Sequence, residues 1–487
     1  MASGYLHGVY TREVPTEVLP ARVVDTNVVL AIGTAPVHTA AAGRKRPVNL
    51  PVLCYSYTEF VESLGWSDDW DAYTLCEVAE SHFAKYGAAP VVCVNVFDPE
   101  KHTVPVEDEE QTFGAKETVT CAKSPVSGLV VKNAEGATTY AEGTDYTVDM
   151  ATGVITRMED GTIPAAAPVK LTYTAADPAA VTAADIIGGV DAKTLKKTGL
   201  ELVDECFPRF RLVPGCILIP KFGELPGVAV AAGAKAQSVN GLFPSLALVD
   251  LPTDKVASAA DAPGYKEKNN LTDGTMVVCW PRIKLGDRRY HISTQLAGRI
   301  SLTDDDAGGT PHESPSNKRA LMDTAVAVDA DGNETEIWYD LKTNNYLNGQ
   351  GIVTVNNFDG GWKFWGNRTA VYPSNTDPKD AFIPVRRFFN WYQSTFILTY
   401  FSKVDGPVRR RFVNTIIKSE NIRLDGYAAR EVIGGGRISF LEKENPATDT
   451  IDGLLRFHLW IAPPVPGRAI EGIFEFDPSY LQTLAGD

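Results

Sequence analysis

Apolar runs and amphipathic segments alternate along the first hundred residues, and this pattern predicts an α/β unit. Asn27–Gly33 and Val91–Phe97 are apolar, β-branched runs that are typical of buried strands. Between them, Ser56–Gly65 and Thr74–Tyr86 have the hydrophobic spacing of helices. A strand, helix, strand order favours a parallel sheet that carries helices on its faces.

The same alternation returns after residue 181. Helices are predicted at Gly199–Cys206, Val228–Ser238 and Ser293–Arg299. Strands are predicted at Cys216–Pro220, Ser245–Leu251, Met276–Trp280 and Gly351–Asn356. Together the two stretches predict one doubly wound, mostly parallel α/β core formed by residues 21–103 and 178–370.

Between these stretches, residues 104–177 lose all helical spacing. They contain short alternating strands separated by glycines, such as Gly143–Val148 and Val169–Thr174. Several short strands at such intervals are typical of a β-sandwich. We therefore expect an all-β sandwich inserted into the α/β core.

A long amphipathic helix marks the start of a different unit, residues 371–467. Within Ile383–Phe401, aromatic and apolar side chains repeat on one face (Val385, Phe388, Phe389, Tyr392, Phe396 and Tyr400), and polar ones on the other (Arg386, Arg387, Asn390, Gln393 and Ser394). A second helix is predicted at Val408–Ser419, and strands at Arg437–Glu442, Leu454–Ala462 and Ile470–Phe476. This order predicts a C-terminal α+β domain.

Both ends of the chain look like strands without a partner of their own. Tyr5–Val14 is strand-prone and stops at Pro15, and Ile470–Asp477 alternates until Pro478. Unpaired strands pair readily with other chains. We therefore predict connecting arms at residues 1–20 and 468–487, with the candidate inter-subunit residues Tyr5, Val9, Tyr10, Val14, Ile470, Ile473, Phe474 and Phe476.

Length and charge narrow the class of protein. A chain of 487 residues exceeds what one hydrophobic core usually supports, so several domains are expected. The net charge of −15 argues against a general nucleic-acid binder. No apolar run reaches the roughly 20 residues of a membrane helix, and the first residues lack the pattern of a signal peptide. The seven cysteines are scattered through apolar segments, which indicates buried, reduced thiols.

Catalytic motifs are missing from the sequence. It has no G-x-S-x-G elbow, no phosphate-binding loop and no H-E-x-x-H pair, and no two of its seven histidines share a metal-ligand spacing. Asp304–Asp306 resembles a cation site, but a solvated loop is the favoured interpretation. The sequence thus predicts no catalytic residue, no metal and no cofactor.

Basic side chains gather in the two C-terminal helices. Residues 379–440 hold eleven Lys and Arg and five Asp and Glu. Arg386, Arg387 and Arg409–Arg411 either form a solvated face or dock an acidic partner surface, and the sequence leaves both open.

Several segments, taken in order, resemble the contractile tail sheath proteins of myophages and related contractile injection particles. They are Tyr5–Val14, Ala183–Gly189 with Thr198–Leu200, Leu347–Ile352, Trp365–Thr369, Arg386–Trp391 and Phe476–Leu481. The resemblance spans nearly the whole chain. It implies a core that is subtilisin-like in fold, but no protease, because the chain has no G-T-S helix start and Asp250 is expected to stand without partners.

The resemblance also implies a function. Copies of the chain would form stacked hexameric rings around a tail tube, hold neighbours through their arms, contact baseplate and tail terminator proteins, and contract to drive the tube through a target envelope. Assembly would occur in the host cytoplasm and the product would be a virion tail or a released particle, with the β-sandwich outside. The predicted tube-facing residues are Arg386, Arg387, Asn390 and Gln393.

Two alternatives remain open from the sequence. The α/β pattern and the β insertion also suit a hydrolase-like enzyme with a carbohydrate-binding module, and the chain could be another tail component, such as a tube or baseplate protein.

Overall fold

The computed structural model describes residues 22–41, 46–114, 116–338 and 340–480, and its largest element is a mixed sheet. The strand order is β2-β3-β1-β13-β14-β15-β20-β21. The inner strands are parallel, and the edge strands β2 and β21 run antiparallel to their neighbours. The strands are β1 (Val29–Gly33), β2 (Pro51–Cys54), β3 (Val91–Asn95), β13 (Cys216–Leu218), β14 (Leu246–Asp250), β15 (Met276–Cys279), β20 (Ile352–Asn356) and β21 (Lys363–Trp365).

The inner strands confirm the predicted mostly parallel sheet. Every residue of β1, β3, β13, β14 and β20 is buried, which is why these strands read as continuous apolar runs. Successive side chains alternate between two hydrophobic clusters: Leu30 and Ile32 belong to one, Val29 and Ala31 to the other. The sheet is therefore covered on both faces.

Helices and short turns form the layers on the two faces. The first face carries α3 (Ala183–Ile187), η4 (Gly199–Glu205), α4 (Cys206–Phe210), α5 (Pro226–Gln237), α6 (Asp261–Lys268) and α8 (Leu341–Asn348). The second carries α1 (Tyr57–Leu64), α2 (Thr74–Ala79), its continuation η2 (Glu80–Tyr86) and α7 (Ile292–Asp306). Short turns are η1 (Val37–Thr39), η3 (Pro178–Ala180) and η5 (Phe222–Glu224), and β11 (Gly189–Val190) pairs with β12 (Lys197–Thr198).

A second antiparallel sheet covers the carboxyl ends of the central strands. Its order is β17-β16-β18-β19, made of β16 (Arg282–Leu285), β17 (Arg288–His291), β18 (Thr324–Val328) and β19 (Glu334–Ile337). The sequence pattern did not predict it. Helix α7 lies between β17 and β18 in the chain, is about twice as long as predicted and includes Asp304–Asp306. The solvated-loop interpretation of these acids is therefore wrong for Asp304, which is fully buried.

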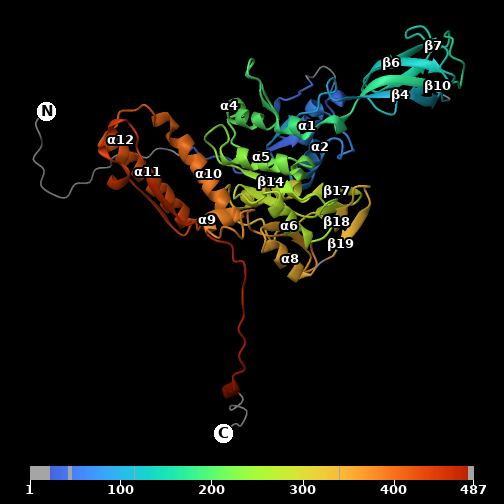
Figure 1. The fold of residues 1–487 in the computed structure, drawn as a ribbon. Helices are drawn as coiled ribbons and strands as arrows, with labels where there is room; N and C mark the ends of the chain where they lie inside the picture. The colour runs from blue at the N-terminus through green and yellow to red at the C-terminus, as the bar shows by residue number, and fades with distance from the viewer. Residues whose placement is uncertain (1–21, 42–45, 115, 339, 481–487) are drawn as a thin grey trace, which may run out of the picture.

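Residues 103–176 form two small antiparallel sheets that project from the core (Figure 1). One sheet contains β4 (Thr103–Thr112), β10 (Pro168–Ala176), β6 (Val126–Asn133) and β7 (Thr139–Tyr140), and the other β5 (Thr118–Thr120), β9 (Val154–Arg157) and β8 (Tyr146–Asp149). They share a hydrophobic cluster of their own that includes Val131, Tyr146 and Leu171. The strands predicted in this stretch are present.

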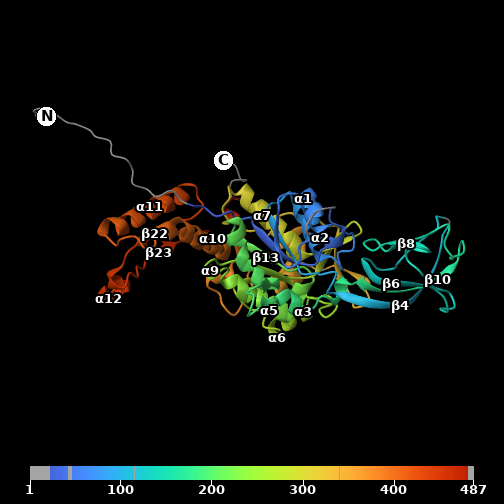
Figure 2. The same ribbon diagram turned by 90° about the horizontal axis from the view of Figure 1, so that it is seen from above.

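The C-terminal helices lie at the opposite end of the core from these sheets (Figure 2). They are α9 (Pro378–Ala381), α10 (Ile383–Tyr400), α11 (Arg410–Ala429) and α12 (Ala447–Ile451), with the turns η6 (Phe401–Lys403) and η7 (Glu442–Glu444). A two-stranded sheet, β22 (Gly436–Ser439) and β23 (His458–Ile461), packs beside them. Helix α10 matches its prediction to within one residue.

All seven cysteines are buried and free, which confirms the predicted thiols. Within the described ranges, no helix is long and apolar enough to cross a membrane.

Candidate functional site

The C-terminal arm is the most exposed apolar segment of the structure. Ile470, Ile473, Phe474 and Phe476 are between 76 and 98 % exposed. The arm extends away from the core below α9 (Figure 1). The strand predicted at Ile470–Phe476 is not formed in the single chain, because a strand needs a partner and the arm has none among the described residues.

The other predicted arm residues, Tyr5, Val9, Tyr10 and Val14, lie outside the described residues.

An apolar groove lies between helix α10 and strand β23. It has a volume of about 340 Å³ and is lined by Phe389, Tyr392, Gln393, Phe396, Ile397, Leu459 and Ile461. The sheet beside it has only the strands β22 and β23, so each keeps one unpaired edge within the described chain. A two-stranded sheet is marginally stable by itself, and an added strand would extend its hydrogen bonding.

The four residues predicted to face a tube do not form one exposed surface. Gln393 is exposed, whereas Arg387 and Asn390 are 5 and 7 % exposed. Asn390 donates to the Ser245 carbonyl at 3.0 Å, and Arg386 is part-buried. The prediction that the arginines project into solvent is therefore wrong for Arg387.

A buried ion pair explains the position of Arg387. Its Nη1 donates to Asp304 Oδ1 at 2.8 Å, and Nη2 contacts the second oxygen of the same carboxylate. Burial alone would lower the pKa of Arg387, but the Asp304 carboxylate outweighs it and the pKa is raised. The pair fastens α10 to the end of α7, which fixes the C-terminal helices against the α/β core.

Exposed basic residues remain at the start of helix α11. Arg409 and Arg410 are exposed, and the first turn of α11 holds no acidic residue. The exposed apolar side chains Phe401, Val404 and Val408 lie just before them in the chain. A positive charge at a helix N-terminus interacts unfavourably with the helix dipole, so Arg409 and Arg410 each destabilise the start of α11 by about 0.3–1 kcal/mol. This segment is thus the exposed candidate for an acidic partner.

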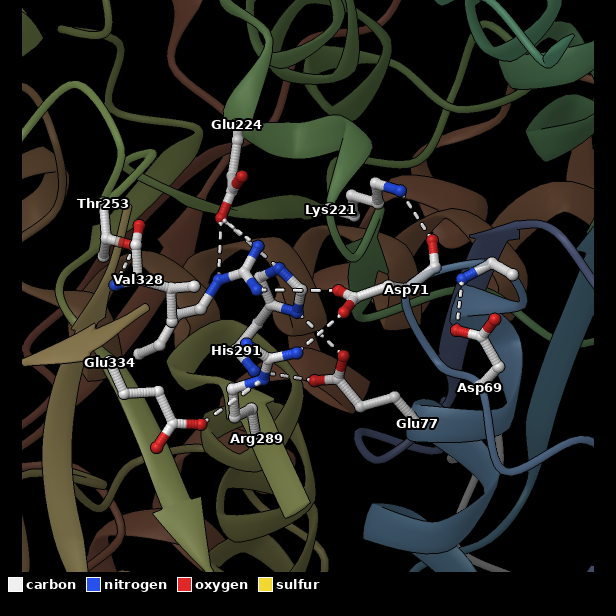
Figure 3. Close-up of polar contacts among 12 residues, drawn as sticks. Asp69, Asp71, Glu77, Lys221, Glu224, Thr253, Arg289, His291, Val328 and Glu334 are labelled. Atoms are coloured by element: carbon white, nitrogen blue, oxygen red, sulfur yellow. Dashed lines mark hydrogen bonds and ion pairs between the residues drawn. The ribbon is translucent and has the colours of Figure 1, made fainter. Parts of the chain in front are cut away.

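A network of charged side chains, buried around His291 and exposed at Asp71, lies where the second sheet meets the core (Figure 3). His291 Nδ1 lies 2.7 Å from Glu77 Oε2, and its backbone N–H donates to Glu77 Oε1 at 2.7 Å. Its Nε2 lies 3.4 Å from Glu224, an ionic contact without hydrogen-bond alignment. Arg282 pairs with Glu224 at 3.0 Å, and Arg289 with Asp71 at 2.9 Å.

The charge of His291 decides what this network can do. Burial would lower its pKa, but the attraction of Glu77 and the contacts with both carboxylates outweigh burial and Arg282 and raise the pKa to about 10. An imidazolium held between two carboxylates cannot accept a proton near neutral pH.

Asp250 also has partners, contrary to the prediction. It ends β14 and accepts hydrogen bonds from the backbone N–H of Ser293, at 3.0 Å, and from the Ser293 hydroxyl. Burial raises the pKa of Asp250 to about 6. Because Ser293 donates to a carboxylate and His291 faces two others, the three side chains do not form the hydroxyl, imidazole and carboxylate relay of a serine hydrolase.

The network occupies the edge of the sheet at which open α/β proteins usually bind ligands. Here side chains that join α2, η5 and the β16–β17 hairpin occupy that edge and leave a pocket of about 170 Å³, lined by residues that include Glu77, Arg282 and His291. Among the described residues, no cluster of three or more His, Cys, Asp or Glu has metal-binding geometry. The sequence missed this network because its members are far apart in the chain, Glu77 and His291 by 214 positions.

Comparison with known proteins shows similarity along the entire chain. A tail sheath protein of Burkholderia phage BcepMu is 32 % identical over 504 residues, with all of both chains covered. The sheath complex of an extracellular contractile injection system, PVC, in its contracted state has a TM-score of 0.59 at 13 % identity and covers 99 % of this chain and 100 % of its own. The contracted helical sheath of the anti-feeding prophage has a TM-score of 0.57 at 12 % identity, with 98 and 100 % covered. A family model described as "Protein of unknown function UCP028589" matches residues 98–185.

Proposed function

This chain belongs to the tail sheath protein family, and we propose that its copies form stacked hexameric rings around a tail tube and contract to drive the tube through a target cell envelope. Membership makes it a structural subunit of a contractile tail sheath. The observation that carries the proposal is the full-length 32 % identity to a phage tail sheath protein. The buried charge network, which lacks a relay, gives no support to the hydrolase alternative.

The arms supply the proposed links between neighbours. The exposed run Ile470–Phe476 donates its backbone hydrogen bonds to the open edge of the β22–β23 sheet in a second copy. Its apolar side chains fill the groove beside Phe396. Residues 1–20 act in the same way as the N-terminal arm. Four large apolar side chains of the arm are more than three-quarters exposed in the single chain. Each of them contributes about 1.5–3 kcal/mol to the free energy of association when a neighbour buries it fully.

Contact with the tube is assigned to exposed basic side chains. Arg387 and Asn390 are buried and cannot reach a tube. We therefore assign the contact with the tube to the exposed side chains Arg409 and Arg410, together with Gln393 beside the groove. An acidic tube surface would relieve the unfavourable charge at the start of α11. The baseplate and a tail terminator are the remaining proposed partners. Residues 103–176, which project from the core, lie on the outside of the sheath. Assembly takes place in the host cytoplasm before the tail joins the virion.

Disulfide trapping tests the arm contact. Protein with Ile461→Cys on β23 is mixed with a second variant that carries one added cysteine, placed at each of positions 470–476 in turn. The seven native cysteines are buried in both variants. Strand pairing predicts inter-copy disulfides with an alternating pattern along the arm, because successive side chains point to opposite faces. Ile451→Cys, on the exposed helix α12, is the matched control. Equal trapping at Ile451→Cys and Ile461→Cys would contradict strand donation.

A further inference from the structure

A cleft lies at the root of the C-terminal arm. It has a volume of about 670 Å³. Its walls come from the two segments Asn345–Gly349 and Trp365–Arg368, from residues 312–318, and from the arm root Pro464–Ala469. The first two segments overlap sequence motifs that the fold alone does not explain.

Glycines bring these two segments into close contact. Gly366 has φ +137°, and a Cβ there would lie 2.7 Å from Asn348 Oδ1 and 3.0 Å from Val353 Cα. Gly351 has φ +68°, and its Cβ would lie 2.6 Å from the Tyr372 carbonyl oxygen. With its amide oriented to satisfy its neighbours, Asn348 donates to the carbonyls of Ile352 and Trp365, both at 2.9 Å. The floor of the cleft is thus rigid.

Arg368 lies in this cleft and forms no ion pair with an acidic residue of the described chain. Its guanidinium carbon is 4.3 Å from the ring centroid of Tyr372 and 3.7 Å from that of Phe382. The atoms Nε and Nη1 are buried and have no hydrogen-bond partner among the described residues. A buried donor without a partner destabilises the fold, and it does so more strongly when it is charged.

A second guanidinium lines the same cleft. Arg468 is exposed and belongs to the arm root. Burial and the charge of Arg468 lower the pKa of Arg368. Glu313 is the one acidic residue in the described wall of the cleft, and it is paired with Lys318 at 2.8 Å. Apart from the paired Lys318, the cleft therefore holds two guanidinium groups that no acidic residue of the described chain balances.

We propose that this cleft binds the carboxylate of an Asp or Glu side chain from a second copy of the chain, held between Arg368 and Arg468. The inference rests on the proposed assembly, since the arm root that forms one wall leads into a neighbour. Guanidinium groups bind carboxylates in a planar, two-pronged geometry. The chain carries 61 Asp and Glu and 46 Lys and Arg, so a second copy presents a surplus of carboxylates. Their binding sets the direction in which the arm leaves the core.

Carbodiimide coupling of assembled protein tests the proposal. Arg468→Lys places a primary amine in the cleft, and the reagent joins it to a carboxylate in contact through an amide bond. Mass spectrometry of mixed, isotopically light and heavy copies then distinguishes adducts within a chain from those between chains. Arg209→Lys is the control for the chemistry, because Arg209 lies 2.6 Å from Glu205 of its own chain and must give an intrachain adduct.

The expected result is one dominant inter-copy adduct at position 468 in assembled protein and none in unassembled protein. Arg468→Glu should raise the concentration needed for assembly at least tenfold. Assembled Arg468→Lys protein without an inter-copy adduct would overturn the inference and leave the sheath function intact. A second result would also overturn the inference: no such adduct forms, and 10 mM inorganic phosphate stabilises unassembled wild type but not Arg468→Gln. The site would then be assigned to a small anion. Wild type that does not assemble would remove the proposed function itself.

Discussion

Removing the carboxylate of Asp304 should unfold the contact between helix α10 and the core. In Asp304→Asn, the Arg387 guanidinium stays 5 % exposed but loses its counter-ion. Breaking one side of a buried ion pair costs about 3–5 kcal/mol, because the remaining charge is desolvated and unpaired. Glu313→Gln is the matched control, since its pair with Lys318 is about 44 % exposed and is worth about 1 kcal/mol or less.

Urea unfolding followed by tryptophan fluorescence measures both changes, and hydrogen exchange shows whether the lost protection lies in α10. The double change Asp304→Leu with Arg387→Met should recover most of the loss, because an apolar pair of similar volume needs no desolvation of charge. A loss below about 1 kcal/mol for Asp304→Asn, equal to that of the control, would refute the view that this pair fixes the C-terminal helices.

Three further predictions follow from the exposed and titrating groups. Deletion of residues 468–487 should leave a folded protein with unchanged circular dichroism, because the described side chains of the arm are exposed and contribute nothing to the core. The same deletion should abolish assembly in electron micrographs, and normal cylinders would contradict the linking role of the arm. Burial lowers the pKa of His82 from 6.5 to about 4, so the unfolded chain binds a proton at a higher pH than the folded chain does, and the free energy of unfolding should fall by about 3 kcal/mol as the pH drops from 6.5 to 4. His82→Gln should remove this part of the acid sensitivity, and a variant with the pH profile of wild type would refute the prediction. The pKa of His291 is raised instead, so its contribution to the free energy of unfolding is fully present below pH 6.5 and should be lost between pH 6.5 and 10. In urea unfolding measured over this pH range, His291→Gln should therefore lose less stability towards alkaline pH than wild type does, and an equally steep loss would contradict the prediction.

The central sheet was predictable because its chemistry is local. Parallel strands that are buried on both faces must be continuous apolar runs, so β3 and β14 can be predicted from the sequence. Helix α10 was equally legible from its aromatic spacing, but the polar residues opposite that face were assigned to solvent. The prediction failed for Arg387 because a second buried face needs a partner that is 83 positions away, at Asp304.

Similar reasons explain the rest of the site. Asp250 and Ser293 are 43 positions apart, and no local pattern brings them together. The second sheet was missed because, apart from the apolar β18, its strands are short and contain charged residues, as in Arg282–Leu285 and Glu334–Ile337. For the C-terminal arm the alternation indicates a strand, yet the arm pairs with no strand of the described chain. This agrees with the proposal that its partner is the open edge of a second copy.

Electron microscopy of the purified full-length chain tests the central claim most directly. Concentrated protein at neutral pH, with and without its tail tube protein, is examined in negative stain and in vitreous ice. A sheath subunit predicts long, striated, hollow cylinders with six subunits in each ring, and density for Ile470–Phe476 beside β23 of a neighbouring copy. Dispersed single particles at every concentration, with or without the tube protein, would contradict it.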